Sequence, residues 1–113
     1  MDEIKRGQIY LTVLNGTGCE QKGKRPVLII QNNVGNKYSP TTIVVPVSSC
    51  NKKNNLPVHV KISNRKLYKR SIALCEQIQV IDKSRFLRKL CTISEKELHE
   101  INKALKISIG LDD

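Results

Sequence analysis

The first eighty residues alternate short apolar, β-branched runs with polar loops, a pattern typical of a domain built from short strands. The predicted strands cover residues 8–13, 26–31, 41–48, 58–62, 71–75, 77–80 and 88–92. Residues 32–40, between the second and third strands, are rich in Asn, Gly, Ser and Pro, and we interpret them as a turn.

The period of the pattern changes near the C-terminal end. Ser94 and Glu97 have the spacing of a capping box, in which each side chain accepts from the other residue's backbone N–H. Apolar residues then recur at helical spacing, at Leu98, Ile101, Leu105 and Ile109. Gly110 is a natural stop. The pattern predicts one domain over residues 1–113, mainly β, in which a small, strongly bent antiparallel barrel carries a C-terminal helix.

Charge narrows the classes of partner. The chain holds 20 Lys and Arg against 10 Asp and Glu, a formal net charge of +10. Such an excess favours a polyanion, either nucleic acid or an acidic protein. With three Tyr, one Phe and no Trp, the chain is too poor in aromatics for a base-stacking platform. Phosphate attraction is therefore assigned to the cations Lys22, Lys24, Arg25, Lys52, Lys53, Arg65, Lys66, Lys69 and Arg70.

Targeting and metal signals are missing from the sequence. No stretch approaches the roughly 20 apolar residues of a membrane span, and the first residues lack the apolar core of a signal peptide. The cysteines, which form no C-x-x-C pair, are Cys19, Cys50, Cys75 and Cys91. Their spacing favours free thiols in a reducing cytoplasm, with two disulfides as the open alternative. We expect a cytoplasmic protein with no membrane association, no metal site and no cofactor.

A charged, glycine-rich loop over residues 18–26 runs directly into the second strand. Pro26 fixes its own φ and favours an extended conformation for Arg25, so the guanidinium is presented from the mouth of a strand. A permanently charged, forked cation held in this way suits a phosphate. The loop is therefore predicted to be a phosphate-handling site.

We expect the second and third predicted strands to form a hairpin centred between residues 36 and 37. The numbers of two directly opposed residues then sum to 73. The predicted pairs are Arg25–Ser48, Val27–Pro46 and Ile29–Val44. Pro46 cannot donate to a ladder, and a bulge there would bring Ser49 to Arg25 in place of Ser48. Either register places a hydroxyl beside the guanidinium.

An arginine and a hydroxyl are sufficient partners for cleavage of RNA. RNA supplies its own nucleophile, the 2′-OH, so the site needs positioning, charge stabilisation and proton transfer but no metal. Glu20 is the nearest carboxylate and is assigned as the base or as the group that orients Arg25. Each residue also has a simpler interpretation: a surface cation for Arg25, a strand end for Ser48, and a solvated loop charge for Glu20.

Ordered motifs over nearly the whole chain resemble the MazF/PemK (Kid) family of toxin endoribonucleases, and most closely the MazF branch of Gram-positive bacteria. They are Arg6-Gly7, Gly18-x-Glu20-Gln21-x-Gly23-x-Arg25-Pro26, Gln31-Asn32-x-x-Gly35-Asn36, Ile43-Val44-Val45-Pro46-Val47-Ser48, Leu56-Pro57-Val58-His59-Val60, Glu76-Gln77-Ile78, and Ala104-Leu105-Lys106-Ile107-Ser108-Ile109-Gly110-Leu111.

The resemblance implies an SH3-like antiparallel β-barrel with a C-terminal α-helix, working as a homodimer. It implies a sequence-specific, metal-independent mRNA endoribonuclease that acts on single-stranded RNA and leaves 2′,3′-cyclic phosphate and 5′-OH ends. The family's catalytic arginine falls on Arg25, and its hydroxyl residue, typically threonine, falls on Ser48. A MazE-like antitoxin is the expected protein partner. As RNA contacts we assign Gln21, Lys24 and Gln77.

Two other functions fit the same barrel. The first is a CcdB-like toxin, which poisons DNA gyrase through its C-terminal helix and is not an enzyme. That mechanism needs a hydrophobic or aromatic terminus, whereas this chain ends Gly110-Leu111-Asp112-Asp113. A basic RNA-binding module without catalysis is the second alternative. Discrete cuts in a long RNA without metal would separate the nuclease from both.

Overall fold

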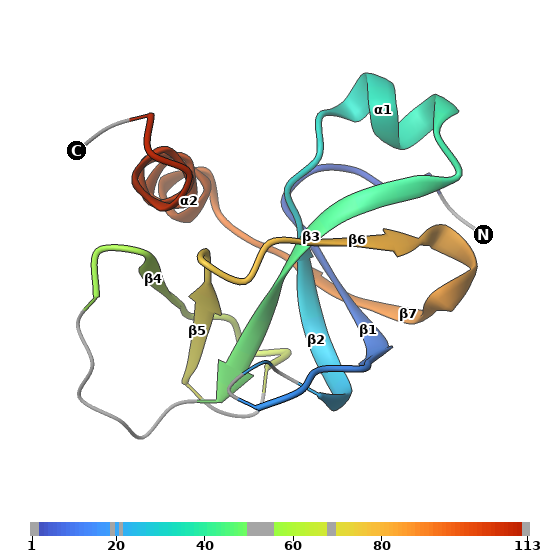
Figure 1. The fold of residues 1–113 in the computed structure, drawn as a ribbon, viewed down its shortest axis with the longest axis horizontal. Coiled ribbons are helices and arrows are strands. Elements are labelled where there is room, and N and C mark those ends of the chain that lie inside the picture. Colours follow the sequence, from blue (N-terminus) through green and yellow to red (C-terminus); the bar gives the residue numbers. More distant parts are fainter. Residues whose placement is uncertain (1–2, 19, 21, 50–55, 68–69, 112–113) are drawn as a thin grey trace.

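The computed structural model describes residues 3–18, 20, 22–49, 56–67 and 70–111. Figure 1 shows strands forming one bent sheet, with a helix at each of two corners. The strands are β1 (Gln8–Leu14), β2 (Gly23–Ile29), β3 (Thr41–Ser49), β4 (His59–Ile62), β5 (Ser71–Leu74), β6 (Gln79–Asp82) and β7 (Phe86–Thr92). The helices are α1 (Asn33–Tyr38), α2 (Glu95–Ser108) and a short 3-10 helix (Lys83–Arg85). Every predicted strand is confirmed to within a few residues.

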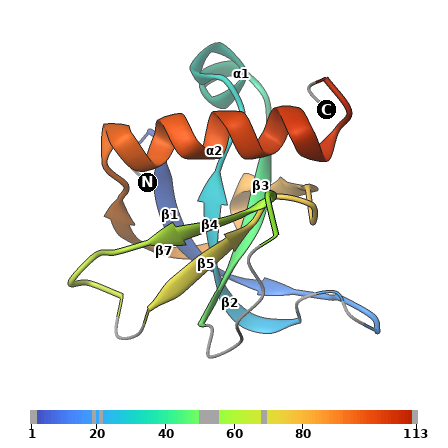
Figure 2. The ribbon, with the colours of Figure 1, turned by 90° about the vertical axis from the view of Figure 1, so that its left-hand side faces the viewer.

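Sheet topology explains the bend. The antiparallel order is β4-β5-β3-β2-β1-β7, with β6 also paired to β3. The first part of β3 pairs with β6 and β2, whereas its last residues, 47–49, pair with β5. This strand therefore folds one part of the sheet over the other (Figures 1 and 2). A mainly β fold with a C-terminal helix is confirmed, as an open barrel in which the outer strands β4 and β7 do not pair in the described part.

The predicted hairpin register is confirmed along the inner part of the β2–β3 ladder, where Val27 pairs with Pro46 and Ile29 with Val44. The predicted pair Arg25–Ser48 is not formed, because the ladder ends at Val27. Beyond Pro46, β3 takes β5 as its partner, and Ser48 lies opposite Ile72. Among the described residues, Arg25 has its ladder partner on the other side of β2, at Thr12 of β1.

Residues 33–38 form helix α1, so the prediction of a simple turn was wrong there. Asn and Gly are weak helix formers, and tertiary hydrogen bonds supply the missing stability. Asn36 is 1% exposed. Its Oδ1 accepts from Thr42 Oγ1 at 2.6 Å, and its Nδ2 donates to the Gln31 carbonyl at 2.9 Å. A buried asparagine with satisfied partners thus fixes a helical turn that local sequence does not favour.

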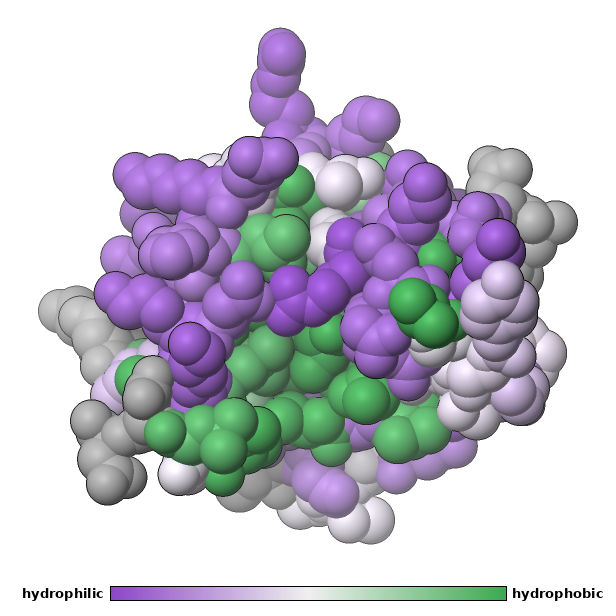
Figure 3. Space-filling view, turned by 90° about the horizontal axis from the view of Figure 1, so that it is seen from above, coloured by the Kyte–Doolittle hydropathy of each residue, from purple (hydrophilic) through white to green (hydrophobic). Residues whose placement is uncertain are grey.

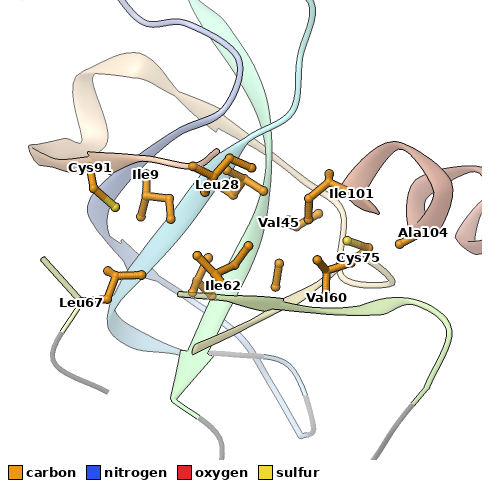
Figure 4. Packing of buried hydrophobic residues seen from close by; sticks show 13 residues of the cluster. Ile9, Leu28, Val45, Val60, Ile62, Leu67, Cys75, Cys91, Ile101 and Ala104 are labelled. Atoms are coloured by element: carbon orange, nitrogen blue, oxygen red, sulfur yellow. The ribbon is translucent and has the colours of Figure 1, made fainter. Parts of the chain in front are cut away.

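Helix α2 packs against β4, and it lies above β4 and β5 in Figure 2. Ile101 and Ala104 enter the core beside Val45, Val60 and Cys75 (Figure 4). Ile101 is fully buried, which is worth roughly 1.5–3 kcal/mol for a side chain of this size. No helix in the described residues is long and apolar enough to cross a membrane.

The start of α2 also holds the loop that follows β4. The capping box is confirmed, since Ser94 Oγ accepts from the Glu97 N–H at 3.1 Å and Glu97 Oε1 accepts from the Ser94 N–H at 3.0 Å. The second oxygen of Glu97 accepts from the Ser63 N–H at 2.8 Å. Leu67 then enters the core, being 9% exposed. Residues 63–67 are therefore anchored at both ends.

Candidate functional site

A pocket of about 620 Å³ lies where β1, β2 and β7 meet the end of β3 and the loop after β4. Its apolar lining consists of Leu11, Pro26, Val47, Leu67 and Leu90. Its polar lining consists of Arg25, Arg65, Lys66, Arg88, Ser49 and Ser71. Four cations and no carboxylate are thus present among the described lining residues, so the pocket suits an anion with an apolar part.

Arg25 lies near the start of β2 and is exposed. Its Nε–H donates to the Lys22 carbonyl at 3.0 Å, which ties the guanidinium to its own loop. Its terminal Nη groups make no hydrogen bond within the described residues. The extended conformation predicted from Pro26 is confirmed by the place of Arg25 in β2, and the two terminal NH2 groups, with four N–H donors, remain for a phosphate.

Two serines, Ser48 and Ser49, end β3. Ser49 lines the pocket, and the partly exposed Ser48 does not. Ser48 Oγ donates to the Ser49 carbonyl at 3.4 Å, a long contact that leaves the hydroxyl able to rotate. Successive residues of a strand point to opposite faces, so only one of the two can face the pocket at a time.

Glu20 lies in the loop before β2 and binds locally. Its Oε2 accepts from Thr17 Oγ1 at 3.1 Å and from the Thr17 N–H at 3.3 Å. Within the described residues no hydrogen bond or ion pair joins it to Arg25. The group that orients Arg25 in the structure is the Lys22 carbonyl.

The predicted RNA contacts lie apart from one another. Lys24 is exposed on β2 beside Arg25, paired across the ladder with Val13. Gln77 follows β5 at the end away from the pocket, where its N–H donates to the Leu74 carbonyl. Gln21 lies outside the described residues. The pocket therefore collects Arg25 with Lys24 nearby, but not Gln77 of the same chain.

Arg88 and Ser71 were missed by the sequence analysis, although both line the pocket. Arg88 stands in an exposed run of β7 that carries no motif, and it reaches the pocket because β7 pairs with β1. Only the strand order brings these segments together. Arg65 and Lys66 were predicted as phosphate-attracting cations without a location.

A second, smaller cavity of about 350 Å³ lies between β4 and α2. Its charged lining residues are His59, Lys61, Glu100 and Lys103. His59 Nε2 and Glu76 Oε2 lie 2.9 Å apart. Both signs of charge are present here, in contrast to the pocket at Arg25.

Two of the cysteines are free thiols in the core, Cys75 and Cys91. Burial, with a further contribution from the Glu76 charge, raises the pKa of Cys75 to about 12. Burial also raises the pKa of Cys91. Cys19 and Cys50 lie outside the described residues. Neither described thiol is poised for nucleophilic chemistry.

The family of PemK-like, MazF-like toxins of type II toxin–antitoxin systems matches residues 5–109 of this chain. The chain therefore belongs to this family. A MazF-like toxin from Staphylococcus saprophyticus, named Endoribonuclease MazF, is 48% identical over 111 residues, covering 96% of this chain and 92% of its own length. A protein of the same name from Staphylococcus epidermidis is 47% identical over 113 residues, covering 97% and 94%.

Solved structures of MazF-like toxins share the fold. An endoribonuclease from a mycobacterial species, in complex with its cognate antitoxin, matches with a TM-score of 0.82 at 22% identity, covering 97% of this chain and 98% of its own. At this identity the likeness concerns the fold alone. It agrees with the open barrel and terminal helix of this MazF-like toxin.

Proposed function

We propose that this protein is an endoribonuclease toxin that cuts single-stranded mRNA at a short sequence, in the cytoplasm, without a metal ion. The names of the staphylococcal relatives support an RNA-cleaving activity. The observation that carries the proposal is the pocket at Arg25, which four cations and five apolar residues line and in which no described carboxylate neutralises the cations.

In the proposed reaction the RNA supplies the nucleophile. The 2′-oxygen forms a bond to phosphorus, the bond between phosphorus and the 5′-oxygen breaks, and a 2′,3′-cyclic phosphate and a 5′-OH result. Arg25 stabilises the charge that builds on the phosphorane, and its N–H groups bind the leaving 5′-oxygen and so assist the proton transfer from water to that oxygen. Glu20 takes the proton of the 2′-OH as general base, a role for which it would have to leave Thr17.

We assign the hydroxyl that donates to a non-bridging oxygen to Ser48, and the resemblance to the family supports this assignment. Ser49 is the competing candidate, since it is the serine that lines the pocket. Both stand at the end of β3, so the same local chain supplies either donor.

We further propose that a MazE-like antitoxin neutralises the toxin. The mycobacterial endoribonuclease of similar fold is described in complex with its cognate antitoxin. A net charge of +10 favours an acidic partner through electrostatic complementarity.

A homodimer is proposed through the apolar face of Figure 3, which shows apolar residues gathered in a broad band. The end of α2 and the start of β6 lie side by side in Figures 1 and 2. Their exposed apolar residues are Ile78, Val80, Ile107, Ile109 and Leu111. A patch of this kind on a soluble protein marks an interface. Sedimentation equilibrium should give a dimer that Val80→Lys weakens; a monomeric wild type at micromolar concentration would exclude this assembly.

The experiment is incubation of purified protein with a long RNA in the presence of EDTA. Discrete cuts that disappear in Arg25→Ala support the proposal. Intact RNA together with trapped DNA gyrase would instead indicate a gyrase poison, and binding without cuts would indicate an RNA-binding module.

A further inference from the structure

The pocket extends well beyond Arg25. Arg65 and Lys66 enter it from the loop after β4, and Arg88 enters it from β7. Their side chains make no hydrogen bond or ion pair within the described residues. Positive charges brought together without a described carboxylate repel one another, so their convergence is explained by an anion that binds there.

These cations stand at fixed positions relative to Arg25. Arg88 pairs with Leu11 of β1, and Leu11 pairs on its other side with Pro26, the neighbour of Arg25. The backbones of Arg25 and Arg88 are thus about two strand spacings apart, roughly 10 Å. Long guanidinium side chains on this scaffold can hold two neighbouring phosphates of one RNA strand.

The loop segment that carries Arg65 and Lys66 is also held in place. The Ser63 N–H is bound by Glu97 at the start of α2, and Leu67 is buried in the core. Arg65 and Lys66 lie between these two anchors. The backbone that carries Arg65 and Lys66 is therefore positioned before any ligand binds, which lowers the entropy lost on binding.

Apolar and hydroxyl groups complete the lining. A site for phosphate alone needs no hydrocarbon, but this pocket carries five apolar residues and the hydroxyls of Ser49 and Ser71. Its volume of about 620 Å³ lies within the usual range for small-molecule sites, about 300–1,000 Å³. Such a lining suits the sugar and base of one nucleotide.

We propose that the pocket binds one nucleoside unit of the RNA together with the phosphates on both of its sides. The scissile phosphate lies at Arg25, and the adjacent phosphate is held by Arg88 with Arg65 and Lys66. This inference rests on the proposed nuclease function and adds a second phosphate subsite to it. Arg88 is then a substrate-binding residue.

The probes are the four nucleoside 3′,5′-bisphosphates, compared with the corresponding 5′- and 3′-monophosphates by calorimetric titration. At least one bisphosphate should bind at least about tenfold more tightly than either monophosphate, because one more charge-assisted contact is made. Arg88→Ala should abolish this preference. Lys89→Ala is the matched control, since Lys89 is the exposed next residue of β7 and does not line the pocket.

Two results would overturn the second subsite: equal binding of bisphosphate and monophosphate by the wild type, or equal losses in the Arg88 and Lys89 variants. Competition by an acidic peptide that depends on Arg88 would assign the pocket to a protein partner instead. Cleavage of a long RNA by the same preparations distinguishes failure of the subsite proposal from failure of the proposed nuclease function. Wild-type cuts without a bisphosphate preference reject the subsite alone, and the absence of cuts rejects the nuclease.

Discussion

The pocket at Arg25 and the cavity between β4 and α2 differ in the signs of the charges that line them. The pocket at Arg25 is lined by four cations and by no described carboxylate. The cavity between β4 and α2 mixes Lys61 and Lys103 with Glu100, and His59 beside it pairs with Glu76 at 2.9 Å. Strands of the same sheet contribute to both, together with the loop after β4 at the larger cavity and α2 at the smaller one.

The charges at the two cavities are therefore expected to affect different properties, anion binding at one and folding stability at the other. At the smaller cavity the carboxylate of Glu100 offsets part of the positive charge of Lys61 and Lys103. The uncompensated charges at the larger pocket oppose folding slightly and gain a partner only when an anion binds. The following variants test this contrast, from the largest expected effect to the smallest.

Arg25→Ala should reduce the rate of RNA cleavage by about 10²–10³-fold, because one positioned donor to the developing charge is lost. Its thermal unfolding temperature should stay close to that of the wild type, since Arg25 is exposed. Lys61→Ala, in the smaller cavity, is the control that removes an equal charge. Equal losses of activity in both variants would mean that overall charge, and not the pocket, drives cleavage.

Ser48→Ala and Ser49→Ala distinguish the two serines at the end of β3. The one that donates to the scissile phosphate should lose about 10²–10³-fold in rate on truncation, and the other should change little. We expect the large loss at Ser48. A large loss at Ser49 alone would move the donor to the residue that lines the pocket, and full activity in both variants would remove the hydroxyl from the mechanism.

Much of the framework follows from local patterns. The strands were predicted because β-branched runs alternate with turn residues, and the register of Val27 with Pro46 followed from the centre of the intervening segment. Helix α1 was missed because its stability comes from the buried Asn36, whose partner Thr42 belongs to another element. Local propensity contains no information on such a contact.

Only part of the candidate site was predicted from the sequence. Arg25 could be recognised from its loop and from Pro26 beside it. Arg88 lines the same pocket because β7 pairs with β1, and no motif in the sequence predicts that pairing. The change of partner along β3 likewise separates Ser48 from Arg25 in the ladder. Strand order and strand bending are properties of the whole sheet, so residues that depend on them are not predicted from their own segments.

The salt dependence of RNA binding sharpens the contrast between the cavities. The slope of log K against log salt is negative. Arg65→Ala should reduce its magnitude by about 0.7, the value for one contact to a single-stranded phosphate. Lys103→Ala, at the smaller cavity, should leave the slope unchanged. Binding to a non-cleavable 2′-deoxy oligonucleotide measures both. Equal slopes for both variants and the wild type would show that Arg65 does not contact phosphate.

Cys75 gives the smallest expected effect, at alkaline pH. Its folded-state pKa of about 12 lies above the ordinary value of 9.0, so between these values the unfolded chain releases the proton more readily. The free energy of unfolding should therefore fall as pH rises from 9 to 12, and Cys75→Ser should flatten that fall. Urea unfolding at several pH values measures it. A fall of equal steepness in the variant would rule out Cys75 as its source.

The central claim is that the RNA's own 2′-OH attacks a phosphate held in the Arg25 pocket, without a metal. The direct measurement uses an RNA with a single 2′-deoxy nucleotide at the mapped cleavage site, incubated with the protein in EDTA. We expect the unmodified RNA to be cut to 2′,3′-cyclic phosphate and 5′-OH ends, and the 2′-deoxy RNA to remain intact at that site. Cleavage at the deoxy position, 5′-phosphate ends, or a requirement for magnesium would contradict it.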